Sequence, residues 1–210
     1  MAYPITLRSL VFYTVATPLY QLGSAPGPCP QPPHRLSVGL LGFGRCAADA
    51  WAHLDVRERD VLAFPTSLGW MMGPWLIYGA LLNRAAMAVF DGAPQGRPFG
   101  EFVAAAGVTQ LGVVPSLVAT WRATACMDNL HWAALRCFSS TGEASSPVLY
   151  HWLSALGQYA PVMECCGGTE LAGGFAAGCP LQPQAPSCFS TPSVGTQIVL
   201  LDADDAQVGI

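Results

Sequence analysis

Short, continuously apolar runs alternate with longer amphipathic stretches along the chain from about residue 45. Continuous apolar runs are typical of parallel strands that are covered on both faces, and the stretches between them have the length of helices. The runs predict strands at 61–64, 86–90, 110–114, 135–139, 162–165 and 197–201. The stretches predict helices at 46–54, 74–82, 99–106, 116–124 and 147–157. This alternation predicts an α/β fold, with a mostly parallel sheet and helices on both faces.

Prolines mark both the helix starts and a boundary in the chain. Pro74 and Pro147 are expected at the first position of their helices, where the missing N–H costs no hydrogen bond. Residues 23–33 read GSAPGPCPQPP, a proline-dense segment that is typical of a linker and excludes a helix or a central strand. We therefore divide the chain into an atypical N-terminal segment, 1–44, and a partial domain, 45–210.

The composition excludes several classes of protein. Hydrophobic residues make up 52% of the 210 and charged residues only 10%, with a net charge of −4, so the chain can bury one core but lacks the basic footprint of a nucleic-acid binder. No apolar run approaches the about 20 residues of a membrane span, and residues 10–16 resemble a secretory signal only weakly. The eight cysteines form no CxxC pair and no metal-ligand spacing. We expect free thiols in a soluble intracellular polypeptide.

Two stretches that follow predicted strands combine glycine, hydroxyl and carboxylate groups. They are SSTGEASS at 139–146 and CGGTE at 166–170. Ligands of open parallel sheets bind beyond the carboxyl ends of the strands, so both stretches are expected at one edge of the sheet. Glycines let backbone N–H groups approach phosphate, and a carboxylate can hold Mg²⁺, which together favour a nucleoside triphosphate. Either stretch alone is more typical of an ordinary turn, and it is their shared placement that favours a site.

A third segment, PTSLGWMMGPW at 65–75, favours an apolar ligand. Met71 and Met72, between Trp70 and Trp75, would form an adaptable wall for such a group, although side chains of these types more often pack beneath a sheet. The histidines, His53 among them, have no companions at metal-ligand spacing and are expected to be structural or exposed. A G-x-S-x-G elbow and a G-x-G-x-x-G loop are both missing, which argues against a serine hydrolase and a dinucleotide-binding enzyme.

Four blocks, in order, resemble the adenylate-forming synthetases and ligases of the acetyl-CoA-synthetase type. They are PTSLGWMMGPWLIYGALLNRAAMAVFDGAP, GVVPSLVATWRAT, RCFSSTGEASS and ECCGGTE. The likeness is greatest to plant and algal acyl-activating enzymes of the peroxisomal type and covers residues 45–210. It implies the central part of the large N-terminal domain of an enzyme that activates a carboxylate with Mg-ATP, forms an acyl-adenylate and passes the acyl group to coenzyme A. It also makes the peroxisome a possible compartment.

The resemblance also implies roles for particular residues. The nucleotide would be bound by Thr141, Gly142, Glu143, Ala144, Glu164, Cys165, Cys166 and Thr169. Thr169 and Glu170 would be catalytic, with Thr169 on phosphate and Glu170 on Mg²⁺. The acyl pocket would be lined by Trp70, Met71, Met72, Thr141 and Gly167. Acetate-selective members have a tryptophan where this chain has Gly167, so we expect a carboxylate larger than acetate.

The sequence departs from the family pattern in its cations. All nine basic residues are arginines, so the chain holds no lysine. The family's phosphate-gripping loop, which ends in lysine, is expected before Arg45, and its lysine-bearing C-terminal domain is expected beyond Ile210. We therefore expect the 210-residue polypeptide alone to be inactive. Two alternatives stay open, a non-catalytic nucleotide-binding or interaction module and an unrelated doubly wound enzyme that uses another nucleotide.

Overall fold

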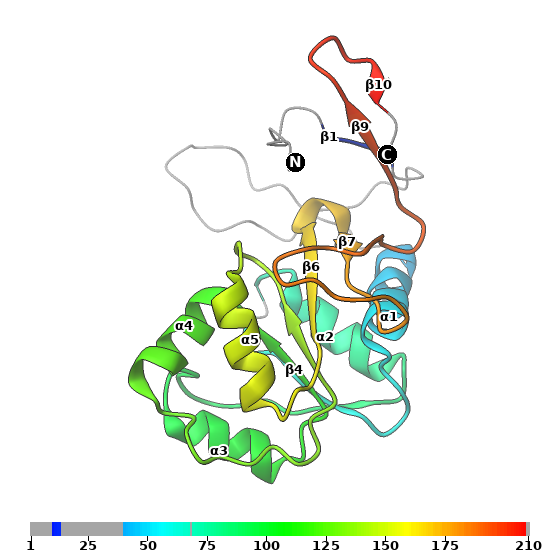
Figure 1. Ribbon diagram of the computed structural model, residues 1–210. Helices are drawn as coiled ribbons and strands as arrows, with labels where there is room; N and C mark the ends of the chain where they lie inside the picture. Colours follow the sequence, from blue (N-terminus) through cyan, green and yellow to red (C-terminus); the bar gives the residue numbers. More distant parts are fainter. Residues whose placement is uncertain (1–9, 14–39, 68, 209–210) are drawn as a thin grey trace, which may run out of the picture.

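The computed structural model describes residues 10–13, 40–67 and 69–208. The proline-dense segment at 23–33 lies outside these ranges, so the proposed boundary at residue 44 stays a prediction. Figure 1 shows a body of helices around a sheet, from which a separate small sheet of β1, β9 and β10 extends. None of the helices in the described part of the chain combines the length and apolar character that a membrane span needs.

A seven-stranded sheet in the order β3-β2-β4-β5-β6-β7-β8 forms the centre of the structure. Its strands are β2 (Val61–Ala63), β3 (Ala86–Met87), β4 (Gln110–Val113), β5 (Cys137–Ser140), β6 (Val162–Gly168), β7 (Gly173–Ala177) and β8 (Thr191–Pro192). The strands from β3 to β6 are parallel, whereas β7 and β8 are added antiparallel. The predicted α/β class and mostly parallel sheet are confirmed.

Helices cover both faces of this sheet, as the sequence predicts. They are α1 (Leu40–Leu54), α2 (Met72–Leu81), α3 (Arg97–Ala105), α4 (Pro115–Thr124) and α5 (Pro147–Leu156). Successive strand residues point to opposite faces, so Phe138 packs in the core beneath α3, α4 and α5 while its neighbour Cys137 packs with α1 and α2. Each apolar run therefore supplies two cores at once, which explains why the runs are continuous.

The two prolines behave differently. Pro147 is the first residue of α5, as predicted, and the preceding Ser146 caps the helix by accepting a hydrogen bond from the Leu149 N–H at 3.3 Å. Pro74 is not the first residue of α2, because that helix begins at Met72. The prediction was wrong because the first turn tolerates proline at several positions, since its N–H groups have no partners within the helix.

The antiparallel strands were missed, and they correct one site prediction. β6 continues to Gly168, so Cys166, Gly167 and Gly168 belong to a strand and not to a loop. The reason is β7, whose sequence GGFAA has one large apolar residue, Phe175, among glycines and alanines, yet pairs with β6 in a hairpin. The predicted strand at 197–201 exists as β9 (Gln197–Leu201), but it pairs with β1 (Leu10–Tyr13) and β10 (Gln207–Val208) outside the main sheet.

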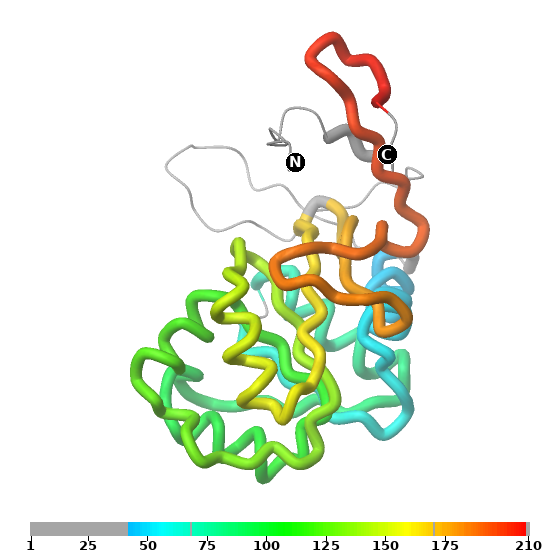
Figure 2. Tube along the Cα trace, viewed as in Figure 1, coloured from blue at the N-terminus to red at the C-terminus, as the bar shows by residue number. Residues whose placement is uncertain are grey.

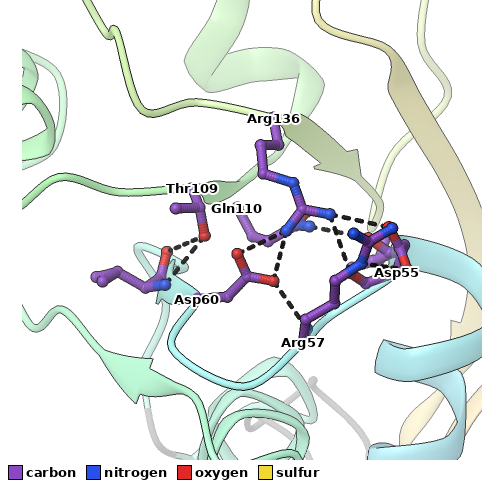
Figure 3. A network of polar contacts seen from close by, with 8 residues as sticks. Asp55, Arg57, Asp60, Thr109, Gln110 and Arg136 are labelled. Carbon is purple, nitrogen blue, oxygen red and sulfur yellow. Dashed lines mark hydrogen bonds and ion pairs between the residues drawn. The ribbon is translucent and has the colours of Figure 1, made fainter.

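A charged network joins the amino ends of the central strands (Figure 3). Arg136, just before β5, donates to both carboxylate oxygens of Asp60 at 2.6 and 2.7 Å and to Asp55 at 2.9 Å. Asp60 also accepts the Arg57 N–H at 2.8 Å, and the Gln110 side chain donates to a carbonyl at the end of α1. These contacts fix the edge of the sheet opposite to the candidate site.

Candidate functional site

The loop that follows β5 and the end of β6 meet at one edge of the sheet. The Thr141 hydroxyl donates to the Cys165 carbonyl at 2.8 Å, and the Thr141 N–H donates to the carbonyl of Val113 in β4 at 3.3 Å. In Figure 2 the traces of both segments rise to the same end of the molecule. The carboxyl ends of three adjacent parallel strands are thereby joined, as expected for a ligand site in an open sheet.

An open cavity of about 490 Å³ lies at this edge. One wall carries large side chains, from Phe64, Trp70, Met71, Met72 and Trp75. A glycine wall, which is backbone alone, comes from Gly167, Gly168, Gly173 and Gly174 of the β6–β7 hairpin. Thr66, Thr141, Glu143 and Thr169 add polar groups to the lining. Such a mainly apolar hollow with few polar groups is typical of a small-molecule site.

All five residues assigned to the acyl pocket line this cavity. They are Trp70, Met71, Met72, Thr141 and Gly167. Trp75, the second tryptophan of the predicted apolar wall, lines the cavity as well. Sequence reasoning missed the glycines of β7. A detectable signal for them was the Gly-Gly pair of GGFAA, which lies two residues after the predicted site.

Gly167 lines the cavity, but a side chain at this position would point toward the backbone of β7 and not into the open space. A Cβ there would overlap the Gly173 carbonyl and lie 2.8 Å from the Gly174 Cα, at the point where the register of β6 and β7 shifts. Even alanine would therefore displace the hairpin. The expectation that a tryptophan here simply closes the pocket needs a different hairpin geometry from the one this chain adopts.

Glu143 has both carboxylate oxygens engaged by helix α4. Oε2 accepts the Ser116 N–H and Oε1 accepts the Ser116 hydroxyl, each at 2.8 Å. A carboxylate at a helix N-terminus is favourable because it meets unpaired N–H groups and the positive end of the helix dipole. The neighbouring Gly142 has φ +91°, a turn conformation that favours glycine. The Glu143 side chain therefore holds the loop that contributes Thr141, Gly142 and Glu143 to the cavity lining.

Three residues assigned to the nucleotide, Ala144, Glu164 and Cys166, lie away from the cavity lining. Glu164 is only 6% exposed and borders a small separate hollow with Ser140 and Tyr150. Burial raises the pKa of Glu164, and a hydrogen bond with Ser145 partly opposes this. Among the described residues, its Oε1 has no hydrogen-bond partner.

The two cysteines of β6 are not poised as nucleophiles. Burial raises the pKa of Cys165 to about 11, and its thiol donates to the Thr141 hydroxyl at 3.5 Å. Burial also raises the pKa of the half-buried Cys166. Both are therefore thiols at neutral pH, and a thiolate is the reactive form. The seven cysteines within the described ranges are free.

Thr169 and Glu170 lie in a short 3-10 turn, Thr169–Leu171, between β6 and β7. Thr169 borders the cavity and is partly exposed. The Glu170 side chain lies outside the described part of the structure, so its assignment to Mg²⁺ stays a prediction. Among the side chains that are described, no group of three or more histidine, cysteine or carboxylate residues is arranged to hold a metal.

A second cavity of about 450 Å³ lies beyond the Phe64–Thr66 segment, beside the edge strand β3. Its lining includes Met87, Val89 and Phe90 and none of the residues assigned to acyl group, nucleotide or metal. The convergent glycine and hydroxyl groups distinguish the first cavity as the candidate site.

Comparisons with known proteins identify the family of the chain. Residues 42–209 match the family of AMP-binding enzymes. Over 158 residues the chain is 52% identical to the probable peroxisomal acyl-activating enzyme 18 of Arabidopsis thaliana and 51% identical to hexanoyl-CoA synthase of Cannabis sativa. In both cases the match covers 75% of this chain and 22% of the relative.

Solved structures share the fold. Acetoacetyl-CoA synthetase from Streptomyces lividans superposes with a TM-score of 0.72 at 24% identity, over 79% of this chain and 27% of that one. The anthranilate CoA ligase AuaEII, in complex with anthranoyl-AMP, has a TM-score of 0.69 at 19% identity, over 80% of this chain and 33% of that one. The sequence blocks, the parallel sheet and the family match agree, and the chain therefore belongs to the AMP-binding enzyme family.

Proposed function

We propose that this chain is the acyl- and nucleotide-binding part of an acyl-CoA synthetase. In that reaction a carboxylate oxygen attacks the α-phosphorus of Mg-ATP, pyrophosphate leaves, and an acyl-adenylate forms. The thiol of coenzyme A then attacks the acyl carbon, and AMP leaves. The names of the plant relatives support this reaction class. The two relatives that are named as peroxisomal support the peroxisome as the compartment.

The observation that carries the proposal is the Thr141–Cys165 contact at the edge of the cavity. It joins the TGE loop to strand β6, whose end at Gly168 leads into Thr169 and Glu170, so that both segments can face one ligand. Thr141 is better described as a positioning residue than as a phosphate ligand, because its proton is committed to the Cys165 carbonyl. Thr169, at the border of the cavity, remains a candidate hydrogen-bond donor to a phosphate oxygen.

The polar loop and the apolar wall suggest how an acyl-adenylate would lie. The acyl group would pack against Trp70, Met71 and Met72, and the nucleotide would lie along the backbone at Gly142. Bound Mg²⁺ would screen the phosphate charges, and Glu170 is the residue proposed to hold it. Apolar burial stabilises by about 0.8 kcal/mol per methylene, so affinity should rise about fourfold with each added carbon until the cavity is filled. We therefore propose a carboxylate larger than acetate.

Binding and turnover should separate in the 210-residue polypeptide. It contains no lysine, and loss of one group that stabilises developing charge typically costs about 3 kcal/mol in the transition state. We expect it to bind hexanoyl sulfamoyl adenosine, a stable analogue of an acyl-adenylate, and to release no pyrophosphate from ATP and hexanoate.

Calorimetric titration with the hexanoyl and acetyl analogues tests this proposal. Trp70→Ala should weaken hexanoyl binding, because Trp70 lines the cavity. Trp51→Ala is the matched control, since Trp51 is also exposed but lies on α1 away from the cavity. Tighter binding of the acetyl analogue, or equal effects of the two substitutions, would contradict the proposal.

A further inference from the structure

The glycine wall of the cavity has no side chains that could adjust its shape. Gly167, Gly168, Gly173 and Gly174 contribute backbone alone. The width of the cavity therefore depends on where the β6–β7 hairpin lies relative to the large side chains of the lining. Whatever holds this hairpin also determines the space available to a ligand.

Helix α1 holds the hairpin through both backbone polar groups of Gly174. The Gly174 N–H donates to Asp49 Oδ2 at 3.0 Å, and Arg45 Nη2 donates to the Gly174 carbonyl at 2.5 Å. Arg45 also donates to the Thr196 hydroxyl at 2.7 Å, which adds the segment after β8 to the same contact. Figure 1 shows α1 running beside β7.

The packing between α1 and the hairpin leaves no room for a side chain. A Cβ at Gly173 would lie 2.6 Å from Asp49 Oδ2 and 3.2 Å from the Arg45 Cγ. One turn further along α1, His53 Nδ1 donates to the Gly178 carbonyl at 2.9 Å. Successive turns of α1 thus contact the hairpin backbone, and a shift of the helix would be passed directly to the glycine wall.

Stability alone does not account for a carboxylate at this place. Asp49 is 5% exposed, and its Oδ1 has no hydrogen-bond partner among the described residues, with Arg45 Nε 3.7 Å away. Burying a carboxylate is costly, and apolar residues of similar volume often stabilise a core at least as well as a buried ion pair. A charge-assisted hydrogen bond to one backbone N–H is directional, and an apolar contact is not.

We propose that Asp49 and Arg45 are positioning residues that set the width of the cavity by holding Gly174, and that they thereby determine which acyl length is preferred. This rests on the proposed function. Neither residue touches the ligand; both act through the glycine wall.

Amide hydrogen exchange tests the holding role without a ligand. In Asp49→Ala the Gly174 amide should exchange at least tenfold faster, while the amides of Leu111 and Phe138 in the central strands keep their rates. Asp49→Asn should largely restore protection, because its side-chain oxygen can still accept the N–H. Glu101→Ala is the matched control, as it removes an exposed i,i+4 pair with Arg97 on α3. Uniformly faster exchange, or no change at Gly174, would overturn the proposal.

The specificity role is tested with the hexanoyl and acetyl sulfamoyl adenosines. Asp49→Ala should change the ratio of their dissociation constants at least fivefold, and Glu101→Ala should leave it unchanged. Wild-type binding with an unchanged ratio in Asp49→Ala would overturn this proposal alone. Failure of the wild-type chain to bind either analogue would overturn the proposed function and this inference with it.

Discussion

The Arg136–Asp60 pair should contribute far more to stability than a surface ion pair of the same chemistry. Asp60 has a side chain that is 6% exposed and accepts three hydrogen bonds, two from Arg136 and one from the Arg57 N–H. In Asp60→Asn one of the two oxygens becomes an NH₂ group. That group must then face a donor, either the guanidinium or the N–H.

The magnitude follows from this geometry. Hydrogen bonds to charged groups contribute about 1.5–3 kcal/mol, and removing one partner of a fully buried ion pair costs about 3–5 kcal/mol. The Arg136 side chain is 37% exposed, and solvent screens its charge, so the lower part of this range applies. We expect Asp60→Asn to reduce the free energy of unfolding by about 2–3 kcal/mol, which lowers Tm by roughly 4–12 °C in a chain of this size.

Glu58→Gln provides the control, because Glu58 pairs with Arg84 at 2.7 Å on the surface. Its expected cost is about 0.5 kcal/mol, and it should shrink in high salt. Urea denaturation of the two variants and the wild type, with a common m-value, measures the difference. Equal losses of stability in the two variants would refute the reasoning that burial makes the Asp60 pair important.

Three further predictions concern the surroundings of the site. Gly112→Ala places a Cβ within the Phe64 ring, so it should destabilise by about 1–3 kcal/mol in urea denaturation, and a neutral effect would show that the ring moves freely. Glu143→Ala, which removes both contacts with α4, and Ser116→Ala, which removes the hydroxyl contact, should each lower stability by about 1 kcal/mol, and a double-mutant cycle with strictly additive losses would contradict the side-chain contact. The raised pKa of Glu164 means that the folded state holds its proton more tightly than the unfolded state, so this residue's contribution is present below its ordinary pKa of 4.5 and is lost as pH rises through the folded value. The Glu164→Gln variant should therefore gain stability relative to the wild type as pH rises above 4.5. Parallel curves of stability against pH for the two proteins would contradict the raised pKa of Glu164.

The elements with strong apolar patterns were predictable from sequence. The parallel strands β2, β4 and β6 and the helices between them fall within a few residues of their expected positions, because each strand supplies apolar side chains to two covered faces. The hairpin strand β7 was not predictable in the same way. Four of its five residues are glycine or alanine, so it lacks a strong apolar run, and it is held by hydrogen bonds between Gly174 and α1 that join residues distant in sequence.

The site was predictable at the level of segments but not of side-chain roles. The strand-end rule brought the Thr141 loop and the end of β6 together. It could not show that Glu143 caps α4, or that a Cβ at Gly167 points into β7, because both depend on contacts with strands or helices elsewhere in the chain.

Methyl NMR of the chain with labelled methionines tests the central claim most directly, with hexanoyl sulfamoyl adenosine as the ligand. Met71 and Met72 line the candidate cavity, Met87 lines the second cavity, and Met127 is fully buried in the opposite core. We expect saturable shifts of Met71 and Met72 with Met87 and Met127 unchanged. Shifts at Met87 without shifts at Met71 and Met72, or no saturable shift at any methionine, would contradict the assignment of the acyl-adenylate site.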